Sequence, residues 1–171
     1  SHEEMRVDRQ LEEHPQSDAA TSNWRLGIQS YLSHEFGKRH SNVTGFKYNY
    51  IAYHVDISQS QGEGQLPAEL AKDKGNTGLL QMFTQSKIDI SPEFTLSAGL
   101  HSQIFMLNSN YSIEPRFGLK YRIDKANSLG LACGLHSRIE QLPVYFVEHN
   151  GQHPNKDLDL MKSLHVVLSY N

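Results

Sequence analysis

The sequence predicts an all-β chain: an antiparallel up-and-down meander of about seven long strands that forms part of a larger transmembrane β-barrel. Three observations predict this. Apolar and polar residues alternate along most of the chain, which is the period of strands with two unlike faces. The alternating runs are mostly about 11 to 13 residues long, against about 5 to 6 in ordinary strands. The connections between them alternate between short and long.

The first three strands are predicted over 24–36, 42–57 and 78–90. In the first and third, most apolar side chains lie at even positions. In the second, the apolar positions change phase between Tyr50 and Tyr53. One extra residue in the ladder would produce such a change, so we expect a β-bulge near Ile51–Ala52.

The last four strands are predicted over 94–107, 113–123, 128–139 and 163–171. Their apolar side chains lie at even positions in the first and last of these, and at odd positions in the other two. Tilted strands of about 9 to 11 residues are long enough to cross a bilayer. Strand length therefore favours a membrane barrel over a soluble one. No helical period is present.

The connections predict which ends of the strands face which side of the membrane. Three are short, at 37–41, 91–93 and 124–127, one at 108–112 is intermediate, and two are long, at 58–76 and 140–162. Transmembrane barrels have short periplasmic turns and longer extracellular loops. On this interpretation the polar segment 1–23 is also extracellular, and the first strand runs inward.

Composition and motifs predict no catalysis. The chain of 171 residues has a net charge of -3, so no nucleic-acid partner is expected. The single Cys133 excludes an internal disulfide. No Gly-x-Ser-x-Gly elbow occurs, and the ten histidines show no ligand pattern. We therefore expect neither an enzyme, nor a metal site, nor a cofactor.

In a membrane barrel the apolar face meets lipid and the polar face lines the lumen. Aromatic residues near strand ends on the apolar face are expected to form girdles: Trp24, Phe36, Phe94 and Tyr121. The polar face supplies the candidate lumen residues, which are His101, Gln103, Glu114, Arg116, Lys120, His136, Arg138 and His165.

Three segments resemble the mid-to-late barrel of TonB-dependent outer-membrane receptors: FTLSAGLHSQIF at 94–105, NYSIEPRFGLKYRI at 110–123 and SLGLACGLHSRIEQLPVYF at 128–146. The resemblance is carried by Ala-Gly-Leu-His at 98–101, Pro-Arg at 115–116, and Gly134 followed by Pro143 and Tyr145. It covers 80–171 well and 24–57 loosely.

The resemblance implies a bacterial outer-membrane protein that takes up a scarce nutrient (a metal chelate, an oligosaccharide or a peptide) with TonB-coupled energy. The implied partners are outer-membrane lipid, the protein's own plug domain, TonB and the small nutrient. Such receptors have 22-stranded, plugged barrels, so the plug and the barrel remainder are expected outside this chain. About seven strands are an odd number, whereas single-chain bacterial barrels close with an even one. Candidate lumen residues would then contact the plug.

The alternative is a soluble or small β-barrel that binds an apolar ligand inside. The two hypotheses differ in the direction of the apolar face. It points inward in a soluble ligand-binding barrel and outward in a membrane barrel.

Overall fold

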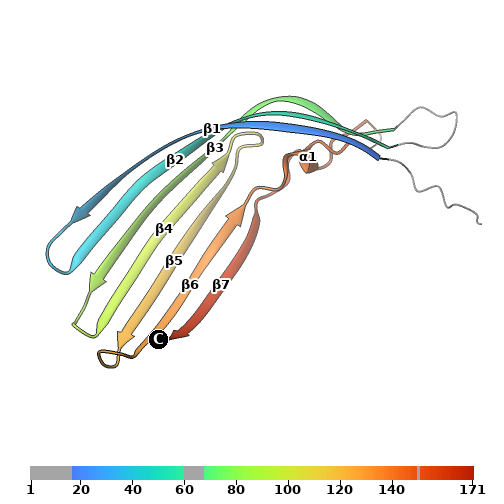
Figure 1. The fold of residues 1–171 in the computed structure, drawn as a ribbon. Helices are drawn as coiled ribbons and strands as arrows, with labels where there is room; N and C mark the ends of the chain where they lie inside the picture. Colours follow the sequence, from blue (N-terminus) through green and yellow to red (C-terminus); the bar gives the residue numbers. More distant parts are fainter. Residues whose placement is uncertain (1–16, 60–67, 150) are drawn as a thin grey trace, which may run out of the picture.

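A computed structural model describes residues 17–59, 68–149 and 151–171, and it confirms the all-β meander. Seven antiparallel strands form one sheet in the order of the sequence. The sheet curls around a hollow, and α1 lies on its concave side (Figure 1). The described residues contain no helix that is long and apolar enough to cross a bilayer. The elements are β1 (Ser17–Glu35), β2 (His40–Gln59), β3 (Ala68–Asp89), β4 (Phe94–Phe105), β5 (Asn110–Arg122), β6 (Ser128–Arg138), α1 (Leu142–Tyr145) and β7 (Met161–Tyr170).

The first three strands are longer than predicted. β1 begins at Ser17 and β3 at Ala68, so most of the loop predicted over 58–76 and part of the segment 1–23 belong to strands. The remainders, 60–67 and 1–16, lie outside the described residues. The prediction ended each strand where apolar alternation ends. Ladder hydrogen bonds between backbones do not require alternation, and here they continue through polar sequence.

The predicted β-bulge near Ile51–Ala52 is wrong. Both neighbours pair with β2 without interruption at this point: Ile51 lies opposite Arg25 of β1 and Thr77 of β3. The register shifts only further along, between Ile57 and Ser58 on the β3 side.

The change of phase in β2 instead marks a change in which face is covered. Ile51, Tyr53 and Val55 point to the concave face, where they are buried at 2%, 8% and 0% exposure. They pack against the segment between β6 and β7. We call this buried cluster the outer core: Ile51, Tyr53, Val55, Ala71, Phe105, Leu142, Tyr145, Phe146 and Leu160.

The segments 139–149 and 151–160, together called the cap, are folded against the sheet. The Tyr53 and Phe146 rings stack with centroids 4.8 Å apart. The side-chain amides of Asn108 and Asn110 donate to the Leu158 carbonyl at 3.1 and 2.9 Å. The cap also contains α1, a single helical turn that the sequence did not predict, with Pro143 in its first turn. Pro favours this position because its missing N–H is not needed there.

The cap predicts an alkaline transition. Burial, and then the nearby Glu140 charge, raise the pKa of Tyr145 above its ordinary value of 10.0, although the Glu140 backbone N–H donates to its hydroxyl. The neutral phenol therefore stabilises the folded cap fully below pH 10, and this contribution is lost as pH rises through the folded-state pKa.

We expect proteolysis of the cap to increase above pH 10 in the wild type. Tyr145→Phe has no phenol to ionise and should lose this pH dependence. It should also lose about 1 kcal/mol at neutral pH, because the Glu140 N–H loses its acceptor. An unchanged alkaline transition in Tyr145→Phe would contradict this assignment.

Gly45 lies where two aromatic side chains approach the backbone. Its cross-strand neighbours are Tyr31 and Phe83. An added Cβ would lie 2.6 Å from the Ser30 carbonyl oxygen and 2.9 Å from Phe83 Cζ. We expect Gly45→Ala to lower the free energy of unfolding by about 1 to 3 kcal/mol through overpacking. Gly118→Ala is the control, because its nearest neighbour would be 3.7 Å away. Equal effects would refute the packing argument.

Candidate functional site

The two faces of the sheet differ in chemistry. Beyond the outer core, cross-strand register places most apolar side chains of the strands on the convex face, for example Leu119 opposite Leu96 and Leu131. Many of these side chains are exposed: Leu26 is 59% and Leu168 is 78% exposed. Contiguous exposed apolar surface of this kind marks an interaction surface.

Aromatic side chains border the convex apolar surface at two levels along the strands. Trp24, Tyr50 and Tyr111 lie toward the cap end, where Trp24 and Tyr50 meet edge to face at 6.3 Å. At the turn end are Phe36, Phe94, Tyr121 and Tyr170, and the Phe94 and Tyr121 rings stack at 4.6 Å. Tyr111 and Tyr121 lie about 34 Å apart along β5 at the usual rise. Strands of this span would cover a height of about 25 Å if they were tilted as in a transmembrane barrel.

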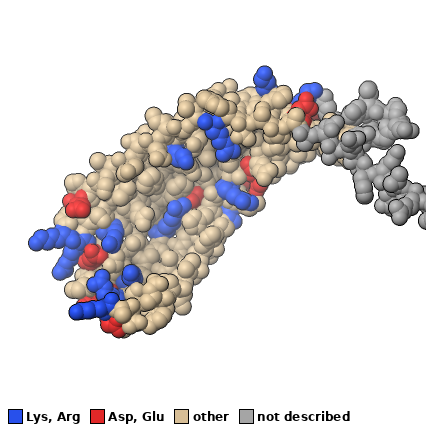
Figure 2. Space-filling model, viewed as in Figure 1, with Lys and Arg blue, Asp and Glu red and all other residues tan. Residues whose placement is uncertain are grey.

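The concave face carries the ionised side chains. Figure 2 shows Lys, Arg, Asp and Glu within the hollow of the sheet, and further charged side chains at the left and lower ends of the view, where the turns between strands lie. At the centre of β5 lies Glu114, whose side chain is 3% exposed. A buried carboxylate requires hydrogen-bond donors, and the neighbouring strands supply them.

Five side chains donate to the two carboxylate oxygens of Glu114. Oε1 accepts from Gln103 Nε2 at 3.2 Å, Ser112 Oγ at 2.9 Å and Ser137 Oγ at 2.5 Å. Oε2 accepts from Arg116 Nη2 at 3.1 Å and lies 3.0 Å from His101 Nδ1. Together these residues form the acid cluster, which links β4, β5 and β6.

The acid cluster is built to hold structure and not to transfer protons. Both Glu114 oxygens are already occupied, so no free carboxylate is available as a general base. Gln103 is itself fixed, because its amide donates to the Ser137 carbonyl at 2.9 Å. The network also fixes the side chains of His101 and Arg116, which are 15% and 45% exposed and so remain partly in contact with solvent.

Four of the eight candidate lumen residues meet in the acid cluster: His101, Gln103, Glu114 and Arg116. His136 and His165 form a second group, with ring centroids 4.7 Å apart. Arg138 lies near the end of the β6–β7 ladder, opposite Met161. Lys120 lies apart from both groups.

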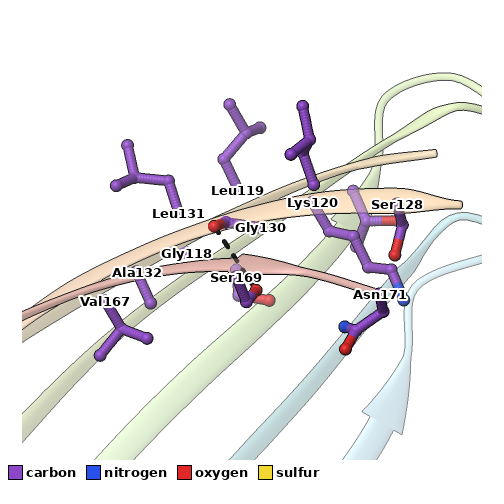
Figure 3. Close-up of a pocket in the computed structure, with 13 residues that line it drawn as sticks. Gly118, Leu119, Lys120, Ser128, Gly130, Leu131, Ala132, Val167, Ser169 and Asn171 are labelled. Carbon is purple, nitrogen blue, oxygen red and sulfur yellow. Dashed lines mark hydrogen bonds between the residues drawn. The ribbon is translucent and has the colours of Figure 1, made fainter. Parts of the chain in front are cut away.

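Lys120 borders a shallow depression of about 230 Å³ near the turn end of the concave face. Small residues, among them Gly118, Gly130 and Ala132, form much of its lining. Figure 3 shows Leu119 and Leu131 pointing to the opposite face from Lys120 and Asn171. The close-up also shows Ser169, whose hydroxyl donates to the Gly130 carbonyl at 3.5 Å.

Two members of the acid cluster, Ser112 and Ser137, escaped the sequence prediction. Ser112 was assigned to a loop, but β5 already begins at Asn110. Ser137 has the parity of the apolar face. The β5–β6 ladder ends at Arg116 and Gly134, and beyond this point the Ser137 side chain reaches Glu114. The only signal in the sequence was that Ser137, a polar residue, occupies a position of β6 at which the alternation predicts an apolar one.

Comparison with protein-family models, curated proteins and solved structures gave no match to this chain. Within the described ranges, no group of three or more His, Cys, Asp or Glu side chains is placed to hold a metal ion. The Cys133 thiol is exposed and lies on the convex face, opposite Phe117 and Val166.

Proposed function

We propose that this chain is a barrel segment of a bacterial outer-membrane receptor or transporter, which takes up a scarce nutrient with TonB-coupled energy. The observation that carries the membrane part is the convex apolar surface between two rows of aromatic side chains. Its height of about 25 Å equals that of the lipid-facing band of outer-membrane barrels. The uptake part rests on the resemblance of 94–105, 110–123 and 128–146 to TonB-dependent receptors.

The change of phase in β2 supports the same membrane boundary independently. Tyr50 is the last convex aromatic residue of β2, and Ile51 is the first buried residue of the outer core. Below this level the apolar side chains cover the convex face, and above it they cover the concave face beneath the cap. A strand that leaves lipid no longer needs an apolar outer face, so the switch coincides with the upper aromatic row.

The alternative, a soluble or small barrel with an apolar ligand inside, is disfavoured by the curvature. Such a barrel needs its apolar face on the concave side. Here the concave side carries the acid cluster and the basic side chains of β5 and β6. Its apolar side chains are the outer core, which the cap already fills, and a few others such as Tyr31, Phe83 and Val167.

The test is whether folding requires an apolar phase, and at what depth the strands lie in it. Trp24 is the only tryptophan, so its fluorescence reports one position. We expect native sheet content and a heat-dependent gel mobility in lipid vesicles but not in buffer. Lipids brominated near the headgroup should quench Trp24 more than lipids brominated at the chain ends.

The matched control is Trp24→Phe combined with Phe117→Trp, which moves the fluorophore to the middle of the apolar surface. Its quenching should be strongest with lipids brominated at the chain ends. A monomeric, cooperatively folded chain in plain buffer would overturn the membrane assignment. So would equal quenching of both positions at all depths.

A further inference from the structure

The concave face also contains a small site over Gly134, here called the cradle, which shares only Arg116 with the acid cluster. Gly134 lies opposite Arg116 of β5 and His165 of β7, and opposite residues share a face of the sheet. His136, two residues further along β6, points to the same face. Three nitrogen-rich side chains from three strands therefore surround a position that has no side chain.

The distances at Gly134 show how closely the cradle is lined. An added Cβ would lie 3.2 Å from Arg116 Cγ and 3.5 Å from His136 Nε2. The His136 and His165 rings lie 4.7 Å apart. Ser163, opposite His136 in the ladder, has its hydroxyl 3.1 Å from His165 Nε2. The Pro115 carbonyl oxygen, an acceptor, lies 3.5 Å from the same point, so an anion above Gly134 would have to be held by the side chains of Arg116, His136 and His165 and not by the backbone.

Donor capacity remains after the protein's own contacts are counted. A guanidinium has five N–H donors, and within the described residues Arg116 makes one contact, from Nη2 to Glu114. Its side chain is 45% exposed, so the other donors are accessible. The His136 imidazole adds a donor, and His165 adds one from Nδ1 when its Nε2 accepts from the Ser163 hydroxyl. Planar guanidinium groups bind carboxylates and phosphates through two parallel hydrogen bonds.

The nearest acidic residue, Glu114, does not prevent an anion from binding in the cradle. Glu114 is almost fully buried, and five donors surround its two oxygens. Its contact with Arg116 holds the guanidinium stem beside Gly134. We propose that Arg116, His136 and His165 form a binding site over Gly134 for a small oxyanion, a carboxylate or a phosphate. The site rests on the polar concave face alone and does not depend on nutrient uptake.

The experiment is calorimetric titration of the full chain in maltoside micelles, which contain no phosphate. Inorganic phosphate and acetate are titrated separately. We expect a dissociation constant of about 1 mM or tighter for at least one of them. His136→Gln and Gly134→Ala should weaken this affinity about tenfold or more. Arg116→Gln should weaken it further. A heat-dependent gel mobility like that of the wild type would show that this variant is folded.

Lys120→Gln is the control, because it removes a positive charge four residues along β5 and about 13 Å from Arg116. It should change the affinity by less than about twofold. Binding of phosphate alone assigns a tetrahedral oxyanion, binding of acetate alone assigns a carboxylate, and equal binding of both assigns a site that accepts either. Absence of binding by both anions would overturn the proposal. So would equal losses in Lys120→Gln and His136→Gln, which indicate diffuse attraction.

Discussion

Replacing Leu131 with arginine is expected to lower the free energy of unfolding in lipid vesicles by about 2 to 4 kcal/mol, which is the cost of a charge in the middle of a lipid-facing band such as we propose for the convex face. Leu131 lies on the convex face between Leu119 and Leu168, and it is 44% exposed. The measurement is the urea midpoint in vesicles, read by heat-dependent gel mobility.

Ala132→Arg is the matched control, because it adds the same charge to the next residue of the same strand, on the concave face. It should cost less than about 1 kcal/mol, since substitutions on the lumen side of a barrel meet water. Equal losses of stability at the two positions would show that the convex and concave faces are in the same environment. The proposed membrane orientation would then be wrong.

Glu114→Gln is expected to be the most disruptive change on the concave face, at about 3 kcal/mol. The amide has one acceptor oxygen, so some of the five donors around Glu114 would face an NH2 group. Buried donors without acceptors cost about 1 to 3 kcal/mol each, and Arg116 would lose its carboxylate partner. Because Arg116 is half exposed, the loss should lie at the lower end of that for buried pairs.

Glu35→Gln is the control for Glu114→Gln, because Glu35 is an exposed carboxylate at the end of β1. Its effect on the urea midpoint should correspond to less than about 0.5 kcal/mol. A Glu114→Gln variant as stable as Glu35→Gln would show that the acid cluster does not hold β4, β5 and β6 together.

The sequence predicted the strand order and the chemistry of each face, because alternation reports directly which side chains share a face. It missed the extensions of β1 and β3, where the pattern is polar and only backbone pairing defines a strand. It also misread the phase change at Ile51 as a bulge, because a change of covered face and an inserted residue produce the same pattern. Only the paired register of β1 and β3 distinguishes them.

The candidate site was predictable in part for a similar reason. Parity along β4 and β5 was sufficient to assign His101, Gln103, Glu114 and Arg116 to one face. Ser137 was not predictable, since its side chain turns to Glu114 only where β6 leaves β5. The cradle at Gly134 also depends on how β5, β6 and β7 align, and a single sequence does not contain that alignment.

The direction of the two outermost strands limits how copies of this chain can associate. β1 and β7 are separated by six antiparallel pairings, so both run the same way. In a membrane, identical copies share one orientation, and every edge-to-edge contact between them would bring parallel strands together. An antiparallel contact needs one copy inverted, which a bilayer with distinct sides prevents but a solution permits. Aggregates in buffer therefore have access to antiparallel edge pairings that copies in a membrane do not.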